Sequence, residues 1–139
     1  MKKAKYFLLA CLMMFSICAN SASAASVDTV QPLWDNTYDV YIGHVADGTT
    51  AHCYVDIGIR DGAVLKNVSI RLICMEPPTA ELVQEWSDPE MTVDSLGTHS
   101  FYDTVEGVVP GYGYRLVLQC EVWHNGVCDS ISQYCDAEY

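Results

Sequence analysis

The residues best suited to contact a partner are two aromatic side chains and one cation. Trp123, Tyr54 and Arg115 fall at positions that the alternation of their segments predicts to point outward. Exposed Trp and Tyr are favoured at interfaces because each supplies a large contact area and a polar group. We therefore expect these three residues to bind a partner, and we expect Tyr54 and Tyr41 to join a surface aromatic patch. The alternative is that Trp123 packs under a neighbouring loop.

Catalytic patterns are weak in this sequence. The four histidines are scattered, and Gly-x-Ser-x-Gly is absent. Cys53 follows His52, but adjacent strand residues point to opposite faces, so the two do not form a nucleophile and base. Glu81 and Glu85 are the candidate carboxylate pair, since glycoside hydrolysis uses two carboxylates. A secreted hydrolase is therefore the alternative function.

Metal-binding patterns are also poor. Zinc sites need four converging ligands, whereas the most closely spaced thiols, Cys128 and Cys135, lie seven residues apart and no Cys-x-x-Cys occurs. The acidic segment 88–94 offers oxygen ligands, but it lacks the alternating acids and central Gly of an EF-hand loop. We expect neither a metal site nor a cofactor.

The first residues have the pattern of a secretory signal peptide. Three lysines precede a short apolar run over 6–17, and Ala22-Ser23-Ala24 provides a small-residue cleavage site. The run is shorter than the roughly 20 residues that a membrane span needs. We expect residues 1–25 to be removed, with cleavage after Ala24 or Ala25, leaving a secreted, extracellular mature chain over 26–139 without a membrane span.

Removal of this leader makes the chain strongly acidic. The mature chain keeps four basic and eighteen acidic side chains, a formal charge of −14. Such a field repels nucleic acid, favours solubility and attracts cationic partners. About 114 residues are enough for one domain with its own core.

The elements that must position these residues are short strands. Alternating apolar residues and turn signals predict seven of them, at 36–44, 51–60, 68–74, 79–86, 99–105, 114–124 and 127–134. Their connections are too short for crossover helices, so we predict an all-β fold, a two-sheet β-sandwich. Segment 79–86 also fits a short helix with Leu82, Val83 and Trp86 on one side, but the sandwich context favours a strand.

The chain is organised around a hairpin over 111–131. Asn125-Gly126 separates two alternating runs, and both residue types tolerate the positive φ that a two-residue type I′ turn requires. Tyr114 begins the first strand after Pro110-Gly111. A Tyr at such a corner can bury its ring while its hydroxyl bonds nearby backbone.

From Thr50 to Tyr134 the strand order, the Gly-Tyr-Gly-Tyr-Arg segment and the Trp-His-Asn-Gly turn resemble small secreted immunoglobulin- or fibronectin III-like domains. The Gly-x-Tyr-Arg start and the Asn-Gly turn of this hairpin are similar to those in the last hairpin of uncharacterised exported proteins of Gram-positive bacteria. Two departures from immunoglobulin domains are clear. The third strand has no Trp, and Tyr114 stands six residues before Cys120 instead of two.

The resemblance bears on the cysteines. After removal of the leader five remain, an odd number, so one is free or links two chains into a disulfide-bonded dimer. Because the second and sixth strands face each other across an immunoglobulin-like sandwich, Cys53 with Cys120 is the leading bridge. Cys74 with Cys135 is the second, since both lie near the same end of their strands.

These observations favour a binding module over an enzyme. The sandwich fold carries no ligand with it, because it hosts unrelated functions. We expect a protein or carbohydrate partner at a cell surface or in the extracellular medium, and no nucleic acid. Asn67-Val68-Ser69 fits the glycosylation sequon, which matters only in a eukaryotic host.

Overall fold

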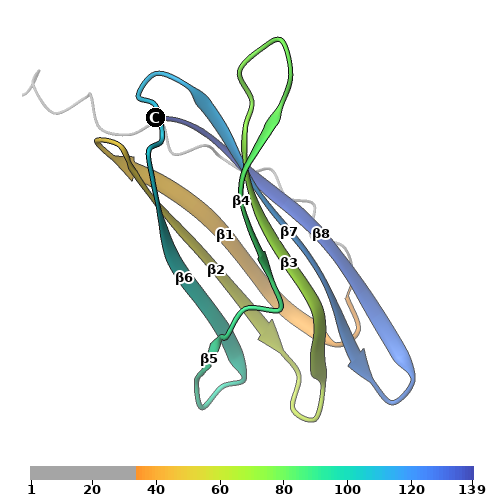
Figure 1. Cartoon of the computed structure of the whole chain (residues 1–139). Helices are drawn as coiled ribbons and strands as arrows, with labels where there is room; N and C mark the ends of the chain where they lie inside the picture. Colours follow the sequence, from red (N-terminus) through yellow and green to blue (C-terminus); the bar gives the residue numbers. More distant parts are fainter. Residues whose placement is uncertain (1–33) are drawn as a thin grey trace, which may run out of the picture.

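The computed structural model describes residues 34–139 (Figure 1). The predicted signal peptide and its cleavage site lie outside the described residues. Residues 34–139 contain eight strands and no helix. The strands are β1 (Thr37–Asp47), β2 (Thr50–Ile59), β3 (Val64–Cys74), β4 (Glu81–Ser87), β5 (Thr92–Val93), β6 (Thr98–Glu106), β7 (Gly113–His124) and β8 (Val127–Glu138).

The strands form two antiparallel sheets of four. Sheet A has the order β1-β2-β6-β5 and sheet B the order β4-β3-β7-β8. The prediction of an all-β, two-sheet sandwich is confirmed (Figure 1). There is one strand more than expected, because the short β5 forms inside a segment that the sequence predicts as a loop.

The core lies between the sheets, because alternate side chains of each strand point inward. The fully buried side chains come from β2, β3 and β7 of the two sheets and from the loop after β6. The largest are Cys53, Val55, Ile57, Ile70, Leu72, Val108, Leu116, Leu118 and Val122. Each buried aliphatic side chain of this size contributes about 1.5–3 kcal/mol. The predicted inward positions of the second, third and sixth expected strands are therefore correct.

The predicted hairpin is confirmed. β7 and β8 pair from Gly113 with Glu138 to His124 with Val127, so β8 extends beyond the predicted end at residue 134. Both turn residues have positive φ, 49° at Asn125 and 80° at Gly126, as the type I′ turn requires.

Tyr114 behaves as the corner pattern predicts. Its ring is buried, and its hydroxyl oxygen accepts a hydrogen bond of 2.9 Å from the backbone N–H of Val109, five residues earlier. This contact fixes the loop between β6 and β7 to the start of β7, where the chain changes sheets.

The ambiguous segment 79–86 is a strand. β4 pairs with β3 at the edge of sheet B, with Trp86 opposite Ile70. The helix alternative for this segment requires Leu82, Val83 and Trp86 to lie together on one buried side. Leu82 and Val83 are exposed in the structure, and only Trp86 packs against the core, so they do not form the buried side of a helix.

A buried carboxylate on β8 holds the segment before β1 against one side of the sandwich. Asp129 accepts hydrogen bonds from the backbone N–H groups of Asp35 at 3.1 Å and Asn36 at 2.7 Å. The Asn36 side chain in turn donates to the carbonyl of Val127 at 3.1 Å. These bonds join the segment before β1 to the edge of sheet B.

All five described cysteines are free thiols, and neither predicted bridge forms. Cys53 lies opposite His44, whose ring packs against Tyr139. Tyr139 stacks on Tyr114, whereas Cys120 lies six residues further along β7, about 20 Å away at ~3.3 Å per residue. Both thiols point inward as predicted, but at different levels of the sandwich.

The second predicted bridge fails for another reason. Cys74 is on β3 and Cys135 is on β8, with β7 between them. Two strand spacings amount to about 9.6 Å, whereas disulfides need Cα atoms within about 7 Å. Both cysteines do lie near the same end of their strands, as predicted, but the strand between them keeps them too far apart for a disulfide.

Candidate functional site

The three residues predicted to bind a partner do not share a surface. Tyr54 lies on the outer side of sheet A, in β2. Arg115 and Trp123 lie on the outer side of sheet B, eight residues apart on β7 and therefore about 26 Å apart. Trp123 points outward, with 37% of its surface exposed.

The outer surface of sheet A gathers three exposed tyrosines and two partly exposed rings. We call its outer surface over β1, β2 and β6 the tyrosine face. Its aromatic residues are Tyr38, Tyr41, His52, Tyr54 and Tyr102. The outward cross-strand rows on the three strands are Asp47–Thr50–Glu106, Val45–His52–Thr104, Gly43–Tyr54–Tyr102, Tyr41–Asp56–Ser100 and Asp39–Gly58–Thr98.

Two glycines make room for the rings. A Cβ at Gly43 would lie 2.4 Å from the hydroxyl of Tyr54, and one at Gly58 would lie 2.4 Å from the ring of Tyr38. The rings therefore lie flat over the neighbouring strand. Tyr54 also stacks on Tyr41, with ring centroids 5.7 Å apart and planes at 22°. Burial, together with the neighbouring Tyr41 hydroxyl, raises the pKa of Tyr54.

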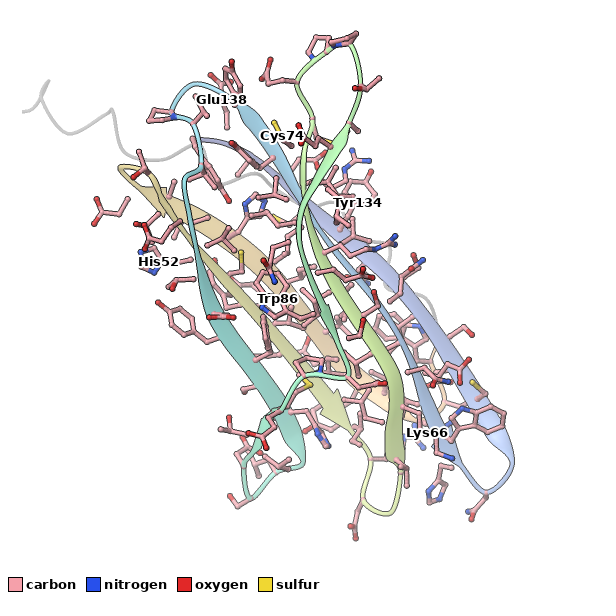
Figure 2. All side chains as sticks on the ribbon, in the orientation of Figure 1. His52, Lys66, Cys74, Trp86, Tyr134 and Glu138 are labelled. Atoms are coloured by element: carbon pink, nitrogen blue, oxygen red, sulfur yellow. The ribbon has the colours of Figure 1, made fainter. Side chains whose placement is uncertain are left out.

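The remaining rings are held by hydrogen bonds. The hydroxyl of Tyr102 is 2.7 Å from Nδ1 of His52, and the two rings stack with planes at 26°. The hydroxyl of Tyr38 donates to the carbonyl of Leu96 at 2.8 Å. The face is thus an ordered array of rings, and Figure 2 shows His52 on this side of the molecule.

The charge of the tyrosine face has one sign. β1, β2, β5 and β6 contain no Lys or Arg. Asp39 and Asp56 lie in rows beside the tyrosines, and Asp56 is directly opposite Tyr41. The rings therefore lie beside carboxylates that no Lys or Arg of these strands neutralises, and the exposed Arg60 stands just beyond the end of β2.

The outer surface of sheet B, here called the paired face, contains both signs. Arg115 forms two hydrogen bonds with Asp136, at 2.6 and 2.7 Å, and its guanidinium lies 4.1 Å from the ring centroid of Tyr134. This contact lowers the pKa of Asp136 below its ordinary value. Figure 2 shows Tyr134 and Lys66 on this side, away from His52.

Trp123 has similar partners on the paired face. Its indole N–H donates to Glu121 at 2.9 Å, and the ammonium of Lys66 lies 6.0 Å from a Trp123 ring centroid. The bonds from Trp123 and from the amide of Asn67 lower the pKa of Glu121. Trp123 is therefore occupied by neighbours from its own sheet.

Sequence reasoning identified Tyr41 and Tyr54 as a possible patch but missed Tyr38, His52 and Tyr102. Tyr102 and His52 stand at outward positions of predicted strands, so the alternation itself contains this signal. Tyr38 reaches the outer side through a register shift between Thr37 and Asp39, which the alternation does not show.

The candidate catalytic carboxylates have no shared cleft. Glu81 and Glu85 are exposed and stand four residues apart on an edge strand, about 13 Å along the chain. Glycosidase carboxylates lie about 5–9.5 Å apart. The structure has open pockets of about 310 Å³ beside His99, about 320 Å³ beside Arg115 and about 270 Å³ beside Glu121, and neither Glu81 nor Glu85 lines any of these three.

The acidic loop is used for backbone contacts. Asp88 accepts from the N–H of Val68 at 2.8 Å. Asp94 accepts from the N–H groups of Leu96 and Thr98 at 2.8 and 2.9 Å, which lowers its pKa. Within residues 34–139 no group of three or more His, Cys, Asp or Glu side chains is arranged to hold a metal ion.

A buried polar cluster lies between the sheets at the end that holds Tyr114. Nε2 of His44 is 2.9 Å from the carbonyl of Cys135 and therefore donates, so Nδ1 accepts from the hydroxyl of Tyr139. Burial lowers the pKa of His44 and raises that of Tyr139. Burial also raises the pKa of Cys53 to about 12, so this thiol is no nucleophile at neutral pH.

The described residues form no helix with the length and apolar character needed to cross a membrane. Comparison of the chain with protein-family profiles, curated proteins and solved structures finds no match.

Proposed function

We propose that the protein acts by binding, without a catalytic step, and that the tyrosine face is its contact surface. The observation that supports this most is the ordered array of four tyrosines and one histidine on one sheet surface. Rings held by stacking and hydrogen bonds lose little conformational entropy on binding, so they contribute more to affinity than mobile side chains.

The setting that we propose is extracellular. It is supported by the signal-peptide pattern and by the strongly acidic mature chain. The proposed resemblance to immunoglobulin-like domains is supported by the strand order of the two sheets and by the Tyr114 corner. The partner is then a molecule at a cell surface or in the medium.

An array of defined peptides and oligosaccharides tests this proposal. It should be probed with the wild type, with Tyr41→Ala and with Tyr134→Ala. Tyr41 and Tyr134 are matched, since 57% and 56% of their surfaces are exposed on opposite sheets. We expect bound features to be lost with Tyr41→Ala and kept with Tyr134→Ala. Equal binding by both variants, or no bound feature for the wild type, would contradict the proposal.

The second candidate, a secreted hydrolase that uses Glu81 and Glu85, has less support because their separation exceeds the glycosidase range. Release of reducing sugar from a polysaccharide panel tests it. Activity that disappears in both Glu81→Gln and Glu85→Gln would establish the hydrolase and remove the binding proposal's claim of no catalytic step.

A further inference from the structure

We infer that the tyrosine face binds a basic polypeptide segment, whose Lys or Arg side chains lie over the exposed tyrosine rings. This inference rests on the proposed function and adds the chemical class of the partner. It follows from the charge of the face, from the arrangement of its rings and from a comparison with the opposite sheet.

The charge of the face favours a cationic partner. The four strands of sheet A carry no Lys or Arg, whereas Asp39, Asp56 and Glu106 point outward among or beside the rings. Asp56 and Tyr41 are directly opposite each other on β2 and β1, so their Cβ atoms are about 5 Å apart. A cation over the Tyr41 ring would therefore have a carboxylate within reach.

The paired face contains the same combination with its cation present. Arg115 lies over Tyr134 at 4.1 Å and is bound by Asp136. A guanidinium over an aromatic ring is attracted by the quadrupole of that ring, and an adjacent carboxylate strengthens the contact. The strands of the tyrosine face supply the ring and the carboxylate but no Lys or Arg, so a cation from a partner completes the arrangement at Tyr41 and Asp56.

The hydrogen bonds of the tyrosine hydroxyls also favour a basic polypeptide as the partner. Tyr38 and Tyr102 use their hydroxyls within the protein, to Leu96 and His52. What these rings offer a partner is mainly their π surface. A neutral oligosaccharide also stacks on rings, but it gains nothing from the negative field, whereas a basic segment uses both.

The experiment is calorimetric titration of the purified protein with synthetic peptides of about twelve residues. One peptide alternates Arg with Ser, the second has Lys for Arg, and the third has citrulline, the neutral isostere of Arg. We expect the Arg peptide to bind more tightly than the Lys peptide, because a guanidinium stacks on rings. We expect the citrulline peptide not to bind, and binding to weaken as salt is raised.

Three substitutions test the face, and two of them, Tyr102→Ala and its control Tyr134→Ala, leave the net charge unchanged. Tyr102→Ala should weaken the Arg peptide about two- to fivefold, the range of an exposed cation–π contact, and Asp56→Asn should weaken it further when combined. Tyr134→Ala, on the paired face, should leave the affinity unchanged. Near-native circular dichroism of each variant checks that the fold is retained.

Each other outcome overturns the inference. Equal affinity of the wild type and Tyr102→Ala for the Arg peptide would show attraction by net charge only. Absence of peptide binding, together with a neutral oligosaccharide that binds the wild type and not Tyr102→Ala, would overturn the basic partner and keep the proposed function. Absence of any binding that depends on the tyrosine face would overturn both.

Discussion

The two outer surfaces of this sandwich differ in how their aromatic side chains are satisfied. On the paired face, Tyr134 lies under Arg115, which pairs with Asp136, and Trp123 lies near Lys66, which stands opposite Glu121 on the neighbouring strand. On the tyrosine face, the rings stack on each other and on His52, and no cation lies among them in the described strands of sheet A. One face therefore pairs its rings with cations of its own sheet, whereas the rings and carboxylates of the other have no Lys or Arg from the strands of theirs.

Because the two faces differ in internal pairing, we expect substitutions on them to affect stability and binding differently. Substitutions of the paired charges on the paired face should lower stability and leave binding intact, whereas removal of an exposed ring or carboxylate from the tyrosine face should weaken binding with little change in stability. Neither face should matter as much for folding as the junction between the sheets, because exposed contacts contribute less than buried ones.

The largest effect on stability should come from that junction. Asp129→Ala would leave the N–H groups of Asp35 and Asn36 without their acceptor, so we expect the free energy of unfolding to fall by about 2–3 kcal/mol. Urea denaturation measures it. Ser130→Ala, at the exposed neighbouring position, should change it by less than about 0.5 kcal/mol. Equal losses in the two variants would show that Asp129 does not hold the junction.

The next effect concerns the glycine under the stacked rings. Gly43→Val should displace the ring of Tyr54 from β1, at a cost of about 1–2 kcal/mol, and should abolish binding at the tyrosine face. Near-ultraviolet circular dichroism and thermal unfolding report the change. Val45→Ile adds a methylene at an exposed position of the same strand and serves as the control. A Gly43→Val variant with unchanged tyrosine signal would mean that the ring packing tolerates the extra volume.

The paired face should contribute a smaller, pH-dependent amount. A double-mutant cycle of Arg115→Gln and Asp136→Asn should give a coupling of about 0.5–1 kcal/mol at pH 7, because the pair is partly exposed. The folded-state pKa of Asp136 is lowered from the ordinary 3.8 by Arg115. This stabilisation is therefore present above about pH 4 and is lost as the pH falls through the folded-state pKa. A coupling that is constant from pH 7 to pH 2 would exclude it.

The smallest effect should have the opposite sign. Asp56→Asn on the tyrosine face removes a carboxylate that has no Lys or Arg on its own sheet. We expect stability to stay within about 0.5 kcal/mol of the wild type and to rise slightly, because the negative charge of the chain decreases. Thermal unfolding at low salt measures it. A clear loss of stability would show that Asp56 is paired within the protein and would erase the contrast with Asp136.

Much of the fold could be predicted from the chain. The Asn125-Gly126 turn, the Tyr114 corner and the inward positions of Cys53 and Cys120 follow from local backbone geometry. Alternation along a strand is a property of the extended backbone, so it assigns each side chain to the inner or outer surface without knowledge of the other strands.

The neighbours of each residue required the tertiary structure. Tyr54, Arg115 and Trp123 all point outward, yet only the pairing of β2 with β1 and β6, and of β7 with β3 and β8, places Tyr54 on a different sheet from Arg115 and Trp123. The same limit separates Cys53 from Cys120, which share the core but differ in level. Strand pairing and register are long-range properties, and the period of two within a strand contains no information about them. The sequence by itself thus determined the inward or outward direction of side chains in the regular parts of the strands, though not that of Tyr38 at the register shift, and the assembled sheets decided which outward side chains form a common surface.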